Sequence, residues 1–158
     1  MKKKLSHYDE SGAARMVDIS SKMPTKRTAR AHAFVKMRPQ VLAQLPSNPK
    51  GNPLEIARVA GISAAKKTSE LIPLCHQLPL SHVSVEFLIE AQGIEIIATA
   101  RTVSQTGVEM EAMTAAAIAA LTIYDMTKAL NKAIEIREIQ LLEKTGGKSG
   151  TFLRSRGK

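Results

Sequence analysis

The sequence predicts an α+β protein in which helices cover one face of an antiparallel sheet. Residues 83–103 alternate apolar and polar side chains on either side of a short turn at residues 91–93, as a hairpin with one buried face does. Residues 108–132 instead repeat alanine and larger apolar side chains at helical spacing. Because strands and helices come in runs rather than in strict alternation, the pattern favours α+β over a parallel α/β sheet.

The first part of the chain contributes three further expected elements. Residues 16–19 predict a short strand. Residues 25–37 predict a helix, because small and apolar side chains recur there every three or four positions. Pro39 suits the first turn of a short helix over residues 40–45, and a loop rich in proline, asparagine and glycine follows.

Two longer elements complete the expected fold. A helix begins at Pro53, is interrupted at Gly61, and resumes until Pro73 stops it. Residues 134–142 predict a closing strand, with a β-bulge near residues 137–138 because the apolar alternation changes phase there.

Composition places the chain among globular proteins of one domain. Of its 158 residues, 44% are hydrophobic and 23% are charged, which excludes a disordered chain. The single cysteine, Cys75, cannot form an internal disulfide, so a reducing compartment is expected. The basic N-terminus is followed by polar residues, and no stretch approaches the roughly 18 apolar residues of a membrane span. We therefore expect a cytoplasmic protein with no membrane contact.

The net charge of +9 predicts an anionic ligand or partner. The basic residues are dispersed along the chain, and a solvated surface position is the expected role of any single lysine. Aromatic residues make up only 3%, so stacking platforms for single-stranded nucleic acid are scarce. Charge by itself does not distinguish a phosphorylated metabolite from nucleic acid or an acidic lipid.

Cys75 and His76 stand between Pro73 and Pro79, in an irregular connection that leads into the hairpin. Rigid loops held by a scaffold are where binding residues concentrate. A thiolate or zinc site is one interpretation, but no CxxC or HxxxH spacing supplies further ligands, and no metal site is expected. From this segment alone, a buried Cys75 and a locally hydrogen-bonded His76 are slightly favoured.

Glu109 and Glu111 open the long predicted helix directly after Gly107 and Val108. Carboxylates in a first helical turn complement the helix dipole, which is a sufficient structural role for at least one of them. Two carboxylates beside an exposed helix start could also accept hydrogen bonds from the N–H groups of a guanine-like base. Periodicity does not choose between these roles.

Asp125 and Lys128 are i,i+3 neighbours near the end of the same helix. One interpretation is a surface ion pair with little effect on stability. The preceding turns are rich in alanine, leucine and isoleucine, which favours a partly desolvated pair instead. Such a pair has shifted proton affinities and can serve as acid and base, and on physical grounds the two interpretations are even.

Residues 146–150 form a Gly-Gly-Lys-Ser-Gly loop close to Lys144. The loop resembles the end of a P-loop, but the first glycine of that motif would fall on Leu142, and only eight residues follow Gly150. A P-loop domain is therefore excluded. A basic, glycine-rich loop can still close over a polyphosphate.

Together and in this order, these four segments resemble the cyclic pyranopterin monophosphate synthase family of molybdenum cofactor biosynthesis. The resemblance runs from residue 16 to residue 152 and departs from the family at no position used for chemistry. Its most specific stretches are LIPLCH at residues 71–76, TGVEMEA at residues 106–112 and AALTIYDM at residues 119–126.

The resemblance implies a ferredoxin-like fold and a lyase that converts 3′,8-cyclo-7,8-dihydro-GTP to cyclic pyranopterin monophosphate with release of pyrophosphate. It implies residues 1–15 as a flexible N-terminal extension, residues 16–152 as a single catalytic domain, and residues 153–158 as a basic C-terminal tail. It also implies a homohexamer, a trimer of dimers. Glu111 and Asp125 would lie about 21 Å apart along one helix, which favours active sites shared between subunits.

The resemblance further implies residue roles. Asp125 is similar to the family's active-site aspartate, and Lys128 to its catalytic lysine. The other matched positions are expected to bind the substrate, the last five of them its anionic part: Leu74, Cys75, His76, Glu109, Met110, Glu111, Arg27, Lys50, Lys66, Lys144 and Lys148.

No cofactor is expected to be essential, because lysines can neutralise a triphosphate without a metal, but a magnesium ion on the triphosphate stays open. The main alternative function is a basic nucleic-acid-binding module, which would need a groove-reading helix or a basic sheet face with aromatic residues. The alanine-rich helix and the glutamates of the hairpin disfavour it, and no nucleic-acid partner is expected. A second alternative is an inactive assembly protein of this fold, in which Asp125 and Lys128 are incidental.

Overall fold

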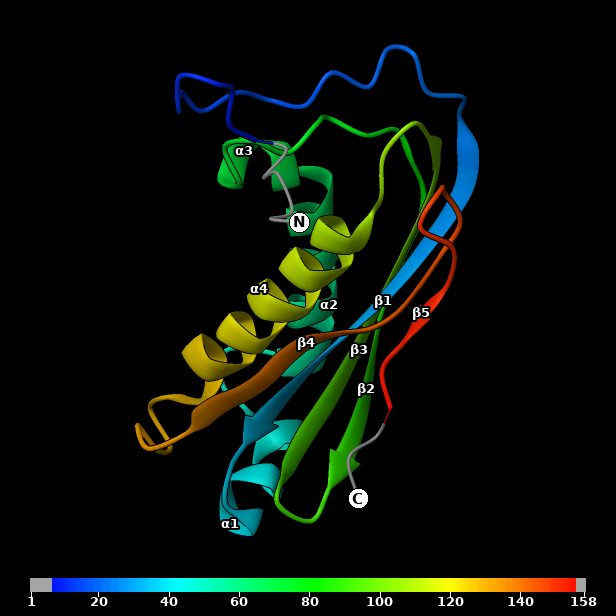
Figure 1. Cartoon of the computed structure of the whole chain (residues 1–158). Coiled ribbons are helices and arrows are strands. Elements are labelled where there is room, and N and C mark those ends of the chain that lie inside the picture. The colour runs from blue at the N-terminus through cyan, green and yellow to red at the C-terminus, as the bar shows by residue number, and fades with distance from the viewer. Residues whose placement is uncertain (1–6, 156–158) are drawn as a thin grey trace.

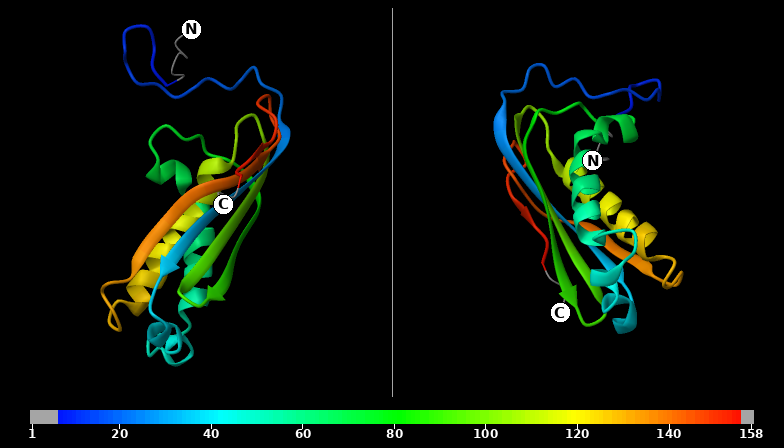
Figure 2. Two further views of the ribbon diagram at one scale, coloured as in Figure 1. Left: turned by 60° about the horizontal axis from the view of Figure 1, so that its bottom comes forward. Right: turned by 180° about the vertical axis from the view of Figure 1, so that it is seen from behind.

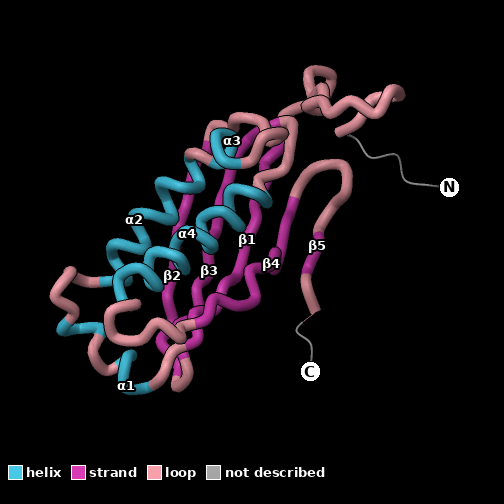
Figure 3. The backbone as a smooth tube through the Cα atoms, turned by 90° about the vertical axis from the view of Figure 1, so that its left-hand side faces the viewer, coloured by secondary structure: helices cyan, strands magenta, loops and turns pink. Residues whose placement is uncertain are grey.

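The computed structural model describes residues 7–155. These residues form one antiparallel sheet of five strands in the order β2-β3-β1-β4-β5, with two long helices side by side on one face (Figures 1 and 3). The strands are β1 Thr25–Lys36, β2 Leu80–Glu90, β3 Gly93–Ser104, β4 Glu135–Thr145 and β5 Phe152–Leu153. The helices are α1 Pro39–Leu42, the 3-10 turn η1 Leu45–Ser47, α2 Pro53–Lys66, α3 Thr68–Leu71 and α4 Glu109–Thr127.

The connectivity of the four long strands confirms the α+β, ferredoxin-like prediction. β1 leads through α2 to the β2–β3 hairpin, and β3 leads through α4 to β4, which gives the strand order 2-3-1-4. The core lies between the helices and the sheet, with Ile94, Ile96 and Ile123 among its fully buried side chains. The opposite face of the sheet carries no helix of the described chain (Figure 3).

β1 corrects the helix that the sequence predicts over residues 25–37. This segment is the central strand, and it pairs with β3 along its whole length, from Thr25 opposite Ser104 to Lys36 opposite Gly93. Alanine favours helices, but the alanines and Val35 that face α4 follow a two-residue period and are fully buried. α4 packs directly on β1, so small side chains on that face let the helix approach closely.

The predicted hairpin and the predicted bulge are both confirmed. β2 pairs with β3 from Leu80 opposite Thr102 to Glu90 opposite Gly93. Between the pairs His32–Gln140 and Phe34–Arg137, β4 contains one residue more than β1. Glu138 lies in this irregularity with φ +55°, a left-handed conformation typical of bulged strands.

Gly61 does not interrupt α2, contrary to the sequence prediction. The helix runs unbroken from Pro53 to Lys66, and α3 follows as a separate short turn. A Cβ atom added at Gly61 would lie 2.9 Å from the carbonyl oxygen of Ala115 in α4. Glycine is present at this position because two helices touch there.

The N-terminal segment departs from the prediction of a strand at residues 16–19. Those residues have no strand pairing within the described chain and run across the end of the molecule at which α3 and the start of α4 lie (Figure 2). Of the expected flexible extension, residues 1–6 lie outside the described part, and residues 7–15 form a turn with a bridge between Tyr8 and Ala14. Of the expected tail, Leu153 belongs to β5, and residues 156–158 are not described.

Within residues 7–155, no helix has both the length and the apolar character needed to cross a membrane.

Candidate active site

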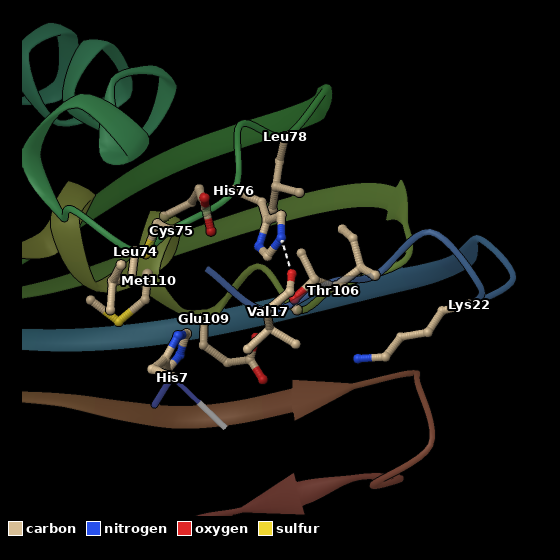
Figure 4. Close-up of a pocket in the computed structure, with 13 residues that line it drawn as sticks. His7, Val17, Lys22, Leu74, Cys75, His76, Leu78, Thr106, Glu109 and Met110 are labelled. Carbon is tan, nitrogen blue, oxygen red and sulfur yellow. Dashed lines mark hydrogen bonds between the residues drawn. The ribbon is translucent and has the colours of Figure 1, made fainter. Parts of the chain in front are cut away.

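A cavity of about 440 Å³ lies where the N-terminal segment, the connection before β2 and the start of α4 meet (Figure 4). We call it the carboxylate cavity. It brings together six residues that the sequence predicts to bind substrate: Leu74, Cys75, His76, Glu109, Met110 and Glu111. Residues 74–76 and 109–111, which are more than thirty residues apart in the chain, therefore line the same cavity.

His76 ties two of these segments together. Its Nε2 atom donates a hydrogen bond to the carbonyl oxygen of Val17 over 2.7 Å, drawn as the dashed line in Figure 4. The bond places a proton on Nε2, so Nδ1 of the neutral ring is an acceptor. The sequence favoured a locally hydrogen-bonded His76, but its partner is 59 residues away in the chain, and His76 lines the cavity.

Glu111 is the most perturbed titratable group of the cavity. It is only 4% exposed, and this burial, reinforced by the nearby charge of Glu109, raises the pKa of its carboxyl to about 7. Burial, and secondarily the charge of Glu111, also raises the pKa of the half-buried Cys75 thiol. A carboxyl that titrates near neutrality can both donate and accept a proton, as a general acid or base must.

Gly107 determines where the neighbouring carboxylate of Glu109 lies. A Cβ atom added at Gly107 would lie 2.7 Å from Cδ of Glu109 and 2.8 Å from its Oε1. The carboxylate therefore folds back over the glycine, and both residues line the cavity. Glu109 and Glu111 do stand in the first turn of α4, as predicted.

A second cavity, of about 650 Å³, continues from the first. We call it the basic cavity, because Lys22, Arg27 and Lys148 line it together with Gly147 and Ser149. The two cavities share three residues, Lys22, Thr106 and Gly107, so they form one groove. Lys22 lies at the opposite end of the carboxylate cavity from Leu74 and Met110 (Figure 4).

Arg27 and residues 147–149 of the glycine-rich loop form the far wall of the basic cavity, and Gly150 does not line it. Nε of Arg27 donates to the Ser104 carbonyl over 3.0 Å, and Nη2 donates to the Gln105 carbonyl over 3.1 Å. Lys144 does not line the cavity itself, but its Nζ donates to the hydroxyl of Ser149, which does. Three of the five predicted anion-binding residues, Arg27, Lys144 and Lys148, thus gather around this loop.

Asp125, Lys128 and Lys50 meet at the other end of α4. Lys128 Nζ lies 2.6 Å from Asp125 Oδ1, and Lys50 Nζ donates to the Asp125 backbone carbonyl over 3.3 Å. The side chains of Asp125 and Lys128 are 60% and 48% exposed, so within one chain the pair fits the surface ion pair, one of the two interpretations that the sequence left even. The hydrogen bond and charge of Lys128 lower the pKa of Asp125, and Asp125 in turn raises the pKa of Lys128.

The predicted site is therefore divided within one chain. Glu111 and Asp125 are 14 residues apart on α4, which separates them by about 21 Å along the helix axis. Lys66 lies apart from both groups and lines a third cavity, of about 380 Å³, together with His82. This third cavity shares only Leu78 with the carboxylate cavity.

Sequence reasoning missed Lys22 and Asn48. Lys22 joins the two cavities but stands alone in a polar loop without a motif, and only its place inside the stretch of family resemblance could have pointed to it. Asn48 donates through Nδ2 to the Met126 carbonyl over 2.9 Å and so fixes the loop that carries Lys50. Over residues 7–155, no cluster of three or more histidine, cysteine or acidic side chains is arranged to hold a metal ion.

The fold and groove define a ferredoxin-like protein in which a cavity lined by carboxylates adjoins a cavity lined by basic side chains. The chain belongs to the MoaC family, which it matches over residues 16–147. It is 55% identical to the cyclic pyranopterin monophosphate synthase of Novosphingobium aromaticivorans, over 94% of this chain and 96% of that protein.

Two further relatives are similar over nearly their whole length. The cyclic pyranopterin monophosphate synthase of Corynebacterium glutamicum is 54% identical over 94% of this chain and 97% of its own. Cyclic pyranopterin monophosphate synthase 2 of Mycobacterium tuberculosis is 54% identical over 95% of this chain and 91% of its own. The family resemblance is confirmed, and nothing supports the alternative of a nucleic-acid-binding module.

Proposed function

We propose that this protein is a lyase that converts 3′,8-cyclo-7,8-dihydro-GTP to cyclic pyranopterin monophosphate and releases pyrophosphate in molybdenum cofactor biosynthesis. The observation that carries the proposal is the groove that joins a carboxylate cavity to a basic cavity in a member of this family. A guanine-derived ring and a triphosphate need these two environments side by side.

The carboxylate cavity is the proposed site of the ring system. Glu109 and Glu111 can accept hydrogen bonds from ring N–H groups, and Met110 and Leu74 supply apolar contact. Because the pKa of Glu111 lies near 7, its carboxyl can exchange a proton with the ring at neutral pH. The Nδ1 atom of His76 adds an acceptor whose orientation the Val17 hydrogen bond fixes.

The basic cavity is the proposed site of the triphosphate. Arg27 and Lys148 line this cavity together, and Lys22 stands at the junction with the ring site. Cations placed where negative charge develops stabilise a departing pyrophosphate. No cofactor is needed for this arrangement in our proposal. A magnesium ion on the triphosphate would act as part of the bound substrate, and turnover measured with excess EDTA tests its contribution.

The Asp125–Lys128–Lys50 group is proposed to reach the same substrate from a neighbouring subunit. Its distance of about 21 Å along α4 from Glu111 exceeds what a compact ligand spans. Symmetric oligomers place two copies of one helix against each other at isologous interfaces, which can unite the two ends. We propose a homohexamer, a trimer of dimers, and a cytoplasmic location, the latter from the single cysteine.

The decisive experiment is incubation of the purified protein with 3′,8-cyclo-7,8-dihydro-GTP. Pyrophosphate should appear in step with a pterin that becomes fluorescent on oxidation. Release of pyrophosphate without a pterin would contradict the ring rearrangement, and binding of the substrate with no product would favour the inactive assembly protein.

A further inference from the structure

We infer that Gly147 is a positioning residue for the phosphate end of the groove. The side chain that it lacks leaves the space in which the guanidinium of Arg27 lies. The inference rests on the proposed function, because it concerns how Arg27 is presented to the triphosphate. It adds to that function a residue that carries no functional group of its own.

Arg27 is held on one side by two backbone carbonyls. Nε donates to Ser104 and Nη2 donates to Gln105, over 3.0 and 3.1 Å. Nη1 has no hydrogen-bond partner among residues 7–155. Because a guanidinium is planar, fixing two of its nitrogens fixes the direction in which the third points. Arg27 therefore presents the two N–H donors of Nη1 in a set orientation, from a side chain that lines the basic cavity.

Gly147 closes on the guanidinium from the other side. A Cβ atom added at Gly147 would lie 2.8 Å from Cζ and 3.1 Å from Nη2 of Arg27, and nearer still to Nη1. The three nearest atoms all belong to this one guanidinium. A separation under 3.0 Å requires one partner to move, and a larger residue at position 147 would occupy the space that Arg27 fills now.

The loop has little freedom to withdraw instead. Gly146, with φ +88°, rests on the backbone of Lys26, where an added Cβ would meet the Lys26 carbonyl. The backbone of β4 just before it is fixed by pairing with β1 at Thr145 and Thr28. The guanidinium is thus the part that must move, and movement breaks its bonds to the Ser104 and Gln105 carbonyls.

The displacement would reach the junction of the two cavities. Gln105 immediately precedes Thr106 and Gly107, two of the three residues that both cavities share. Freeing its carbonyl from Arg27 loosens the segment that leads into the first turn of α4. Gly147 is therefore expected to affect affinity for phosphate more than it affects the fold.

The test compares Gly147→Ala with Gly150→Ala. Both glycines have positive φ, +75° and +64°, so alanine strains the backbone at either position. An added Cβ at Gly150 meets nothing within 4 Å, which makes this variant the control for strain alone. Arg27→Ala and the double variant Arg27→Ala/Gly147→Ala complete a cycle. The probe is inorganic tripolyphosphate, titrated by calorimetry into the intact oligomer at fixed ionic strength.

We expect tripolyphosphate to bind Gly147→Ala and Arg27→Ala about 10- to 100-fold more weakly than the wild type, the range of one hydrogen bond to a charged group. Gly150→Ala should bind within about twofold of the wild type. The double variant should bind like Arg27→Ala alone, because Gly147 acts through that side chain. With substrate, Gly147→Ala should raise KM more than it lowers kcat.

Wild-type affinity in Gly147→Ala, or a further tenfold loss in the double variant, would overturn the inference and leave the proposed function intact. If the wild type binds no tripolyphosphate, the proposed phosphate end fails, and the inference fails with it. Should Gly147→Ala not fold, the double variant decides. If Arg27→Ala/Gly147→Ala folds where Gly147→Ala does not, the clash between residue 147 and the Arg27 guanidinium is supported. If neither of these two variants folds while Gly150→Ala does, the clash is refuted.

Discussion

Replacing Glu111 with glutamine should stabilise the protein at alkaline pH and not at acidic pH. The carboxyl is 4% exposed, and burial is the main reason that its pKa rises from 4.5 in the unfolded chain to about 7. A folded-state pKa above the unfolded one means that folding favours the protonated form. The contribution of that form is fully present below pH 4.5 and is lost as the pH rises through 7.

The size of the effect follows from the shift. A difference of about 2.5 pKa units at about 1.36 kcal/mol each gives about 3 kcal/mol, the cost of holding the ionised carboxyl in the folded cavity above pH 7. Glutamine has nearly the same shape and no charge, so Glu111→Gln should raise the free energy of unfolding by up to about 3 kcal/mol at pH 8. At pH 4.5 the gain should be below about 0.5 kcal/mol, because the carboxyl is then protonated in the folded protein and half protonated in the unfolded chain.

The assay is urea unfolding of both proteins at pH 4.5, 6, 7 and 8, at one protein concentration, since oligomerisation makes apparent stability concentration-dependent. Glu86→Gln, on the exposed face of β2, is the control and should change stability by less than about 0.5 kcal/mol at every pH. A stability difference for Glu111→Gln that is independent of pH, or a loss at pH 8, would refute the reasoning. The same substitution should weaken substrate binding, as expected where a site is strained for function.

Three further predictions follow from the divided site. Asp125→Asn and Lys128→Ala should each lower turnover by orders of magnitude while the unfolding midpoint scarcely changes, because the pair is exposed within its own chain. Near-normal turnover would remove that residue from the mechanism. Lys50→Ala and Lys144→Ala should weaken binding of the triphosphate more than binding of the monophosphate product, and equal losses by calorimetry would indicate a general charge effect. Inactive Glu111→Ala and Asp125→Ala proteins, mixed under verified subunit exchange, should regain activity if sites are shared, and no recovery would place each site within one chain.

Alternation of apolar and polar residues predicted the hairpin, and helical spacing predicted α4, because both patterns were long. The bulge in β4 was predicted because the alternation changes phase there. Both patterns failed at β1, where alanine satisfies both a helical propensity and the need for small side chains under α4. The alternation of Ala29, Ala31, Ala33 and Val35 was present in the sequence, but alanine gives it too little hydrophobic contrast to be read as a strand.

The candidate site was predicted as a set of residues and not as a place. The connection before β2 and the start of α4 do meet, which order along the chain alone could not establish. Exposure of Asp125 could not be predicted, because an apolar neighbouring sequence describes the buried face of a helix as well as the exposed one. Lys22 could be identified as a site residue only from the fold, which places the N-terminal segment across the end of α4.

The contact at Gly61 limits how this sequence can drift over generations. An added methyl group would face three neighbours: the Ala115 carbonyl oxygen, Cγ2 of Val85 at 3.0 Å and Cβ of Ala119 at 3.3 Å. Mutation of Val85 or Ala119 to a smaller residue could make room at the last two. The Ala115 carbonyl belongs to the backbone, so no side-chain substitution removes it. A larger residue at position 61 would therefore require the two helices to move apart. A single substitution of Gly61 is therefore not tolerated without this movement, whereas the substitution Ala119→Gly leaves the helix contact in place.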